Sequence, residues 1–262
     1  MNKTKIDWAD MTWNPVTGCW HNCEYCYAGK IARRFAIRTS YNMDIGGCEF
    51  DCSGKGCETG CMHILDGKRT AYPYGFDPTF HRYRLDEPAK IKKPQNIFVC
   101  SMADLFGDWV PDEWIEKVFE ACEKAPQHRY LFLTKNGKRY RDFSIRQTEN
   151  MWFGQTLTGI DGESLSYSGH NTFLSIEPIL SEFKAVDMWK KFQWVIIGAE
   201  SGDRKGKVIP KREWIENIVN YCKERNVPVF MKDSLKKIWG EPLVQEYPWS
   251  DKLDDTLNKI TG

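Results

Sequence analysis

Residues Gln193-Trp194-Val195-Ile196-Ile197-Gly198 form the clearest strand pattern in the chain, a short apolar run that ends at a glycine. Lys211–Arg225 follows with apolar residues at helical spacing, and Val227–Met231 is another apolar run. A strand, a helix and a strand in this order predict two parallel strands joined by a helix. This stretch therefore predicts an α/β fold with a parallel sheet.

The same alternation extends toward the N-terminus. Strands are expected at Met11–Asn14, Asn96–Cys100, Tyr130–Leu133, Trp152–Thr156 and Thr172–Ile176, and helices at Tyr27–Arg38 and Pro111–Ala125. Six or seven such units predict a partial (βα)6-type parallel barrel, with a doubly wound sheet as the alternative. We expect one domain over residues 1–262, with a cysteine-rich insertion at 40–93 and a surface tail at 240–262.

Composition narrows the class of protein. The chain has 262 residues, of which 41% are hydrophobic and 28% are charged, enough for a sizeable core. The net charge of +1 does not favour nucleic-acid binding through bulk charge. The sequence has no apolar run long enough for a membrane span, and its first residues do not resemble a signal peptide. Ten cysteines, seven of them between residues 19 and 61, predict metal binding in a reducing, cytoplasmic environment.

Three of these cysteines lie in Gly18-Cys19-Trp20-His21-Asn22-Cys23-Glu24-Tyr25-Cys26-Tyr27, directly after the first expected strand. Three thiolates can hold three irons of a [4Fe–4S] cube and leave the fourth iron open, whereas electron-transfer clusters use four cysteines. The alternatives are reduced thiols without metal, or a zinc site completed by His21. Zinc loops favour C-x2-C pairs with a distant fourth ligand, so the spacing favours the cluster.

A second group of cysteines lies in the insertion. Cys48, Cys52, Cys57 and Cys61 have the spacing C-x3-C-x4-C-x3-C among several glycines. Four thiolates in so short a stretch can bind one structural zinc ion or a second [4Fe–4S] cluster. His63 is a substitute ligand if only some of the four bind metal, and the cluster is slightly favoured over zinc.

Polar residues follow the expected strands. They are Ser101, Asp104, Lys135, Gln155, Glu177, Glu200, Ser201 and Lys232. Function collects at the carboxyl ends of strands in parallel α/β folds, so these residues are candidates for one site. A single residue of this kind is more often a helix cap or part of a turn, and Ser101 and Asp104 are equally good candidates for that role.

Several segments together carry a family resemblance. They are Trp13–Cys19, Cys23–Ala28, Ser101–Phe106, Leu131–Lys135, Phe173–Pro178, Ile197–Gly202 and Val227–Lys232. They resemble a phage-associated three-Cys-motif family, largely of unknown function, and this resemblance implies a barrel like that of radical S-adenosylmethionine (SAM) enzymes. The chain departs from this family in its short gap between Cys19 and Cys23, and in Asp233-Ser234-Leu235, where relatives often carry Gln-Trp-Gly.

The cysteine spacing, with an aromatic residue before the last cysteine, also resembles the radical SAM signature. The resemblance implies that the open iron binds SAM, which one electron splits into methionine and a 5′-deoxyadenosyl radical. That radical abstracts hydrogen from a substrate, and an electron donor such as flavodoxin or ferredoxin is required. Tyr25 would pack by the adenine, while Ser101, Asp104, Gln155, Glu200 and Ser201 would contact SAM. Lys135, Glu177 and Lys232 would face the substrate.

The insertion interleaves aromatic and basic residues between Tyr72 and Lys93. Such a surface can stack bases and contact phosphates, which would make the substrate a nucleic acid or nucleotide, with Arg82, Arg84, Lys92 and Lys93 as contacts. The plain alternative is that the rings pack on the domain and the cations are solvated.

The competing function is a non-catalytic metal-binding adaptor for nucleic acid or protein in a phage or mobile-element system, with a separate partner protein. A methyltransferase is disfavoured, because no Gly-rich loop follows the first strand.

Overall fold

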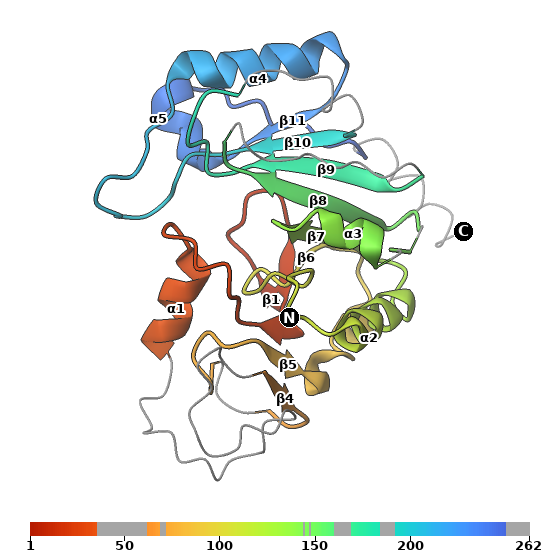
Figure 1. The fold of residues 1–262 in the computed structure, drawn as a ribbon. Coiled ribbons are helices and arrows are strands. Elements are labelled where there is room, and N and C mark those ends of the chain that lie inside the picture. Colours follow the sequence, from red (N-terminus) through yellow and green to blue (C-terminus); the bar gives the residue numbers. More distant parts are fainter. Residues whose placement is uncertain are drawn as a thin grey trace. The chain divides into compact units, whose positions relative to one another are not determined.

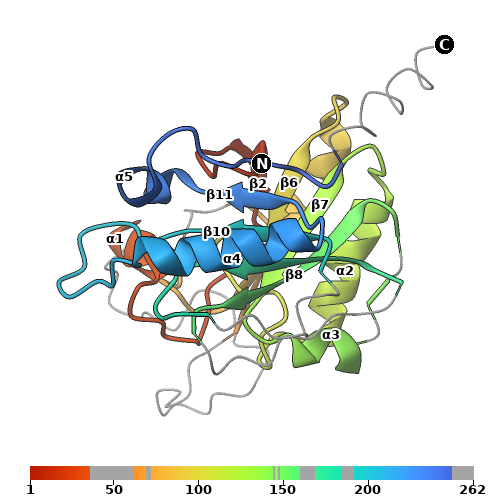
Figure 2. The same cartoon turned by 90° about the horizontal axis from the view of Figure 1, so that it is seen from above.

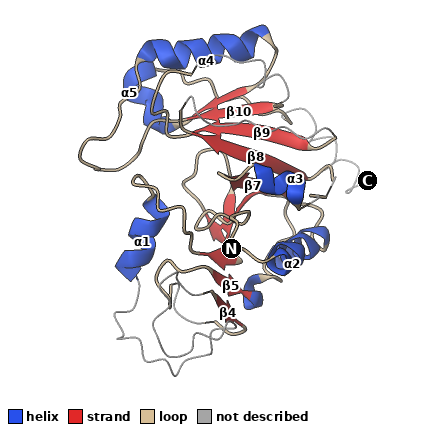
Figure 3. Cartoon of the chain, in the orientation of Figure 1, coloured by secondary structure: helices blue, strands red, loops and turns tan. Residues whose placement is uncertain are grey.

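The computed structural model describes residues 1–35, 62–68, 72–143, 145–146, 148–159, 169–183 and 192–249. The chain divides into two compact units, Met1–Trp152 and Phe153–Gly262. Strands and helices occur in both (Figure 1; Figure 3). The second cysteine group, Cys48, Cys52, Cys57 and Cys61, lies outside the described residues.

The first unit is built on four strands in the order β1 (Asn2–Lys3), β2 (Met11–Trp13), β6 (Asn96–Val99) and β7 (Arg129–Thr134). β1 is antiparallel to β2, whereas β2, β6 and β7 are mutually parallel neighbours. In register, Trp13 lies opposite Val99, and Val99 lies opposite Phe132. The carboxyl ends of these three strands therefore share one edge.

The helices of the first unit are α1 (Tyr27–Phe35), α2 (Asp112–Glu123) and α3 (Lys138–Asp142). Pro111 precedes α2 with an extended backbone, and helical spacing puts Ile115, Val118 and Phe119 on the buried face. The Phe119 ring meets that of Phe132 in β7 edge to face at 5.4 Å. Helix α2 thus covers the two strands that it joins, β6 and β7.

A small second sheet lies in the same unit, with the order β3 (Val16–Thr17), β5 (Thr79–His81) and β4 (His63–Leu65). β3 comes directly before the cysteine loop, and β5 is followed by the short 3-10 helices Arg82–Arg84 and Pro88–Lys90. The insertion thus contributes strands to a sheet that the sequence analysis did not anticipate.

The second unit has the strand order β8 (Met151–Leu157, whose first two residues belong to the first unit), β9 (Asn171–Ile176), β10 (Trp194–Ile197) and β11 (Val229–Met231). β9, β10 and β11 are parallel neighbours. Helix α4 (Arg212–Glu224) lies along β10 and β11 (Figure 2) and buries Ile215, Ile218 and Cys222 in their shared core. Helix α5 (Lys236–Trp239) follows β11.

The expectation of a surface tail from residue 240 onward is only partly correct for residues 240–249. Residues 240–242 are exposed, whereas the segment after them packs on β10 and β11. Gln245 pairs with Phe230 of β11, and Trp249 is 5% exposed. The rings of Tyr247 and Trp249 pack on Trp194 at 5.6 and 5.0 Å. Trp249 is buried and Tyr247 is half-buried, because both rings pack on Trp194 of β10.

The expected strands at Met11–Asn14, Asn96–Cys100, Tyr130–Leu133, Trp152–Thr156, Thr172–Ile176, Gln193–Ile197 and Val227–Met231 are confirmed as β2, β6, β7, β8, β9, β10 and β11. The three long helices are confirmed, α1 as far as Phe35. Outside the small sheet, the strands of each unit follow chain order, without the reversal that a doubly wound sheet requires. The partial barrel and the single domain stay predictions.

Candidate functional site

The cysteine loop leaves the small sheet at Gly18, whose φ is +90°. A Cβ atom at this position would lie 2.1 Å from the carbonyl oxygen of Asp77, so only glycine fits. The Gly18 N–H donates to Met102 O, and the Cys19 N–H donates to Phe76 O at 3.1 Å. The start of the loop is therefore fixed between β5 and the carboxyl end of β6.

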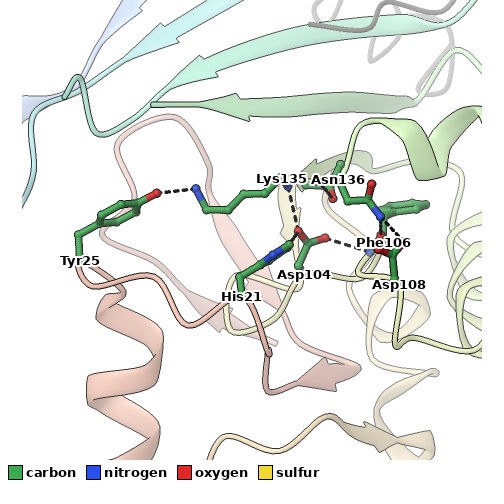
Figure 4. A network of polar contacts seen from close by, with 8 residues as sticks. His21, Tyr25, Asp104, Phe106, Asp108, Lys135 and Asn136 are labelled. Atoms are coloured by element: carbon green, nitrogen blue, oxygen red, sulfur yellow. Dashed lines mark hydrogen bonds and ion pairs between the residues drawn. The ribbon is translucent and has the colours of Figure 1, made fainter. Parts of the chain in front are cut away.

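Asp104, four residues beyond Cys100 at the end of β6, joins the loop to two strands (Figure 4). Its Oδ2 accepts hydrogen bonds from His21 Nε2 at 2.8 Å and from the Lys135 backbone N–H at 2.9 Å. Its Oδ1 accepts from the Phe106 N–H at 3.0 Å. The residue is 5% exposed, so this carboxylate fixes the loop to the ends of β6 and β7.

Tyr25, the aromatic residue before the last cysteine, contacts the same strand end (Figure 4). Lys135 Nζ donates to the Tyr25 hydroxyl at 2.7 Å and lies 5.0 Å from the centre of its ring. Beside it, Asn136 Nδ2 donates to Phe106 O and to Asp108, which steadies the turn after β7. The structure thus brings together Tyr25 and Lys135, which the sequence assigned to SAM and to the substrate.

The thiols of the loop differ in their surroundings. Cys26 Sγ accepts a hydrogen bond from the Gly29 N–H at 3.3 Å. Burial, as the largest effect, and the nearby charges of Asp104, Cys23 and Cys26 raise the pKa of Cys19 to about 12, although a backbone hydrogen bond from His21 lowers it. Three thiolates are the ligand set that a [4Fe–4S] cluster with one open iron requires, and a cluster in this loop stays a prediction. Within the described ranges, no three His, Cys, Asp or Glu side chains form a site for a single metal ion.

Ser101 takes part in local structure at the end of β6. Its Oγ donates to Asn14 Oδ1 at 3.2 Å, and the Met102 N–H donates to the same oxygen at 2.9 Å. Its carbonyl oxygen accepts from the Tyr27 hydroxyl at 2.8 Å. Both Ser101 and Asp104 therefore have the structural role that the sequence analysis left open as the alternative to SAM contact.

In the second unit, Glu177, Gly198 and Lys232 follow residues that lie in register. Ile176 of β9 is opposite Ile197 of β10, which is opposite Met231 of β11. Lys232 Nζ and Glu177 Oε1 form an ion pair across Gly198, where a Cβ would lie 3.2 Å from the Lys232 side chain and 3.3 Å from that of Glu177. The two predicted substrate-facing residues of this unit are therefore direct partners.

The carboxylate of Glu200 is also paired with a cation of the second unit, that of Arg204. The carboxylate accepts two hydrogen bonds from the Arg204 guanidinium, at 2.6 and 2.8 Å, and the Glu200 side chain is 2% exposed. Gln155 in β8 is buried, whereas Ser201 is exposed. Arg204 was missed by the sequence analysis, although its position four residues after Glu200 was a usable signal.

The basic residues of the insertion are partly engaged. Arg82 pairs with Asp66 at 2.7 Å, and Arg84 Nη1 donates to Asn14 O at 2.8 Å. Lys92 and Lys93 are exposed. For the two arginines, the structure therefore favours the plain alternative of packing within the unit.

His21 was considered only as a zinc ligand, and its bond to Asp104 was not anticipated. Nothing in the spacing of the two residues, 83 positions apart, indicates this contact. Asn14, which accepts from both Ser101 and Met102, was missed for the same reason.

Comparison with known proteins defines the class of this chain. The chain belongs to the family described as "Protein of unknown function (DUF5131)", whose sequence model matches residues 3–246. The match spans both units and includes the cysteine loop. No curated protein and no solved structure matches the chain.

Among the described residues, no helix combines the length and the apolar character that crossing a membrane requires.

Proposed function

We propose that this protein is a radical SAM enzyme with a partial-barrel fold, from a phage-associated branch of proteins. It would cleave SAM reductively at a [4Fe–4S] cluster held by Cys19, Cys23 and Cys26, and the resulting 5′-deoxyadenosyl radical would abstract hydrogen from a substrate. One observation carries the proposal: a three-cysteine loop is fixed through Asp104 to the carboxyl ends of β6 and β7. In parallel α/β folds that edge is where cofactors and substrates bind.

The residues of the chain have separable tasks in this proposal. Gly18 lets the loop approach β5, and Asp104 holds His21 and thereby the segment between the first two cysteines. The Gly29 N–H donates to Cys26 Sγ and orients this proposed cluster ligand. Lys135 holds Tyr25 by its hydroxyl, which leaves the Tyr25 ring to pack against an adenine.

The second unit supplies charged groups in complementary pairs at one sheet edge. Glu177 and Lys232 follow β9 and β11, and Glu200 with Arg204 follows β10. In the proposal Glu177 and Lys232 face the substrate, whereas Gln155, Glu200 and Ser201 contact SAM. To bind a ligand, each of these charged groups must leave its partner in the protein, because Glu177 is paired with Lys232 and Glu200 is paired with Arg204.

The test measures SAM cleavage and iron together. Wild-type protein, purified and loaded with iron and sulfide without oxygen and then reduced with dithionite, should convert SAM to 5′-deoxyadenosine. Cys23→Ala should lose that product and the iron of one cube, because an open cluster needs three thiolates. Cys222→Ala is the matched control, since Cys222 is a buried core thiol of α4, and it should retain both.

Two outcomes would contradict the proposal. The first is a fully loaded, reduced wild-type protein that forms no 5′-deoxyadenosine and whose low-temperature EPR spectrum does not change when SAM is added. The second is zinc in place of iron, with partner binding retained without SAM, which would favour the metal-binding adaptor.

A further inference from the structure

Helix α1 presents an apolar stripe to solvent. Tyr27, Ile31 and Phe35 are spaced four residues apart and therefore lie on one face, with exposed fractions of 46%, 38% and 60%. The opposite face is made of small residues, with Ala28 and Ala32 buried against the unit. Large apolar side chains grouped in this way on a surface mark a place where another molecule binds.

The exposed surface of the helix is also basic, with Lys30 and Arg34 beside the stripe and Arg33 further around the helix. Lys30, Arg33 and Arg34 are exposed, and the helix contains no acidic residue. In the part of the chain that the structure describes, no carboxylate forms an ion pair with any of the three. We call Tyr27, Lys30, Ile31, Arg33, Arg34 and Phe35 together the α1 face. The positive charge of the α1 face favours an acidic partner, and its apolar stripe favours a partner whose own apolar groups cover the stripe.

The α1 face lies next to the cysteine loop. Helix α1 begins at Tyr27, the residue after Cys26, and its Gly29 N–H donates to Cys26 Sγ at 3.3 Å (Figure 1). A partner on this face would therefore reach from the residue next to a proposed cluster ligand to a point about two and a half helical turns away. This proximity matters for a partner that must deliver an electron.

We propose that the α1 face is the docking surface for an acidic one-electron carrier protein of low reduction potential, which reduces the cluster. This inference rests on the proposed function. In the step, the carrier is oxidised by one electron and the cluster is reduced by one electron, and no covalent bond forms or breaks. A short helix face suits this task, because electron-transfer encounters use small interfaces and rely on electrostatic steering.

A nucleic acid is the alternative partner, because Tyr27 and Phe35 offer aromatic rings and the basic residues offer donors for phosphate. Ile31 lies at the centre of the stripe and offers neither an aromatic ring for a base nor a hydrogen-bond donor for a phosphate. Burial of Ile31 and Phe35 instead requires apolar groups on the partner, which a protein surface supplies.

The experiment measures cluster reduction by purified, photoreduced flavodoxin in a stopped-flow spectrometer. Arg33→Glu/Arg34→Glu should lower the second-order rate constant about tenfold at low salt, and the difference should shrink as salt screens the charges. Lys3→Glu/Lys5→Glu makes the same change of charge at another exposed pair and should leave the rate constant unchanged. Dithionite, which needs no docking surface, should reduce all three proteins equally.

A second variant tests the stripe without changing charge. Ile31→Ser/Phe35→Ser should weaken binding of oxidised flavodoxin, measured by fluorescence anisotropy, and should keep the salt dependence of the wild type. Both side chains are exposed, so the fold should be retained. Equal binding by wild type and both α1-face variants would overturn the inference.

The binding measurement also separates the two proposals. A protein that takes up no cluster fails the proposed function, whereas the docking surface is still tested by flavodoxin binding. If Arg33→Glu/Arg34→Glu instead lowers affinity for single-stranded DNA and leaves cluster reduction unchanged, the α1 face is a nucleic-acid surface and the inference is wrong.

Discussion

Gly18 occupies a backbone position that other residues cannot adopt without moving their neighbours. Its positive φ and its contact with the Asp77 carbonyl both exclude a side chain. Gly75 also has a positive φ, of 64°, but an added Cβ there would meet nothing within 4 Å. Substitutions at Gly18 and Gly75 therefore separate the free-energy cost of an unfavourable backbone conformation from the cost of a steric clash.

Gly18→Ala should destabilise the first unit by roughly 3 kcal/mol or more, because strain and a clash with backbone add. Gly75→Ala should cost only about 1 kcal/mol, the conformational part alone. Urea unfolding of both variants measures the difference. Equal losses would show that the segment around Asp77 moves aside and that Gly18 is not required by space.

His81 is a buried base in the small sheet. It is 0% exposed, and its Nε2 shares a hydrogen bond of 2.8 Å with Thr17 Oγ1. Burial, and to a smaller extent the positive charge of Arg84, lower the pKa of His81 to about 3. The folded protein therefore holds His81 neutral at pH values where the unfolded chain binds a proton.

Because the folded pKa lies below the unfolded one, the contribution of His81 to stability is complete above about pH 6.5 and is lost as pH falls toward 3. Within that window the loss should approach about 1.4 kcal/mol per pH unit. His81→Gln should remove this slope, so the difference in unfolding free energy between wild type and variant should shrink between about pH 7.5 and about pH 5.5. Parallel curves would show that His81 titrates normally.

At the scale of elements, the parallel strands of the second unit determine which side chains meet. Glu177 and Lys232 follow β9 and β11, which are not neighbours, and the strand between them contributes only Gly198 at this level. The two side chains are 23% and 20% exposed, so water screens their attraction only partly. The ion pair therefore depends on the strand register and on the absence of a side chain at Gly198.

A double-mutant cycle with Glu177→Gln and Lys232→Met should give a coupling free energy of about 1–2 kcal/mol, above that of exposed pairs. The matched control is Arg212 and Glu216, an exposed pair on α4 with 2.8 Å between its atoms, which should give about 0.3–0.5 kcal/mol. Urea unfolding of the single and double variants supplies the values. A coupling no larger than that of the control would contradict the role assigned to Gly198.

At the scale of the whole chain, residues near the C-terminus complete the core of the second unit. Trp194, Phe230, Tyr247 and Trp249 form one aromatic cluster, with ring centres 5.0 to 6.2 Å apart. Trp194 Nε1 donates to Glu246 O at 2.9 Å, which fixes the returning segment. The unit therefore buries residues that lie more than 50 positions apart in the sequence.

Trp249→Ala should cost roughly 3–5 kcal/mol, because it leaves a cavity over Trp194. Trp239→Ala is the control, since Trp239 is only partly buried and stacks with Arg212, and it should cost about 1 kcal/mol. Differential scanning calorimetry of both variants measures the loss. A small loss for Trp249→Ala would mean that residues 240–249 are dispensable for the unit.

The sequence by itself determined β2, the strands β6 to β11, the three long helices and the position of the cysteine loop, because apolar periodicity and cysteine spacing are local properties of the chain. The tertiary structure alone decided that His21 binds Asp104, that Lys135 binds Tyr25, and that Glu177 meets Lys232 across Gly198. Those contacts join residues between 55 and 110 positions apart, and strand register and burial determine them. The tertiary structure also decided that Trp249 lies in the core. The sequence could not show this, because an aromatic residue near the C-terminus looks the same in sequence whether its side chain is solvated or packed.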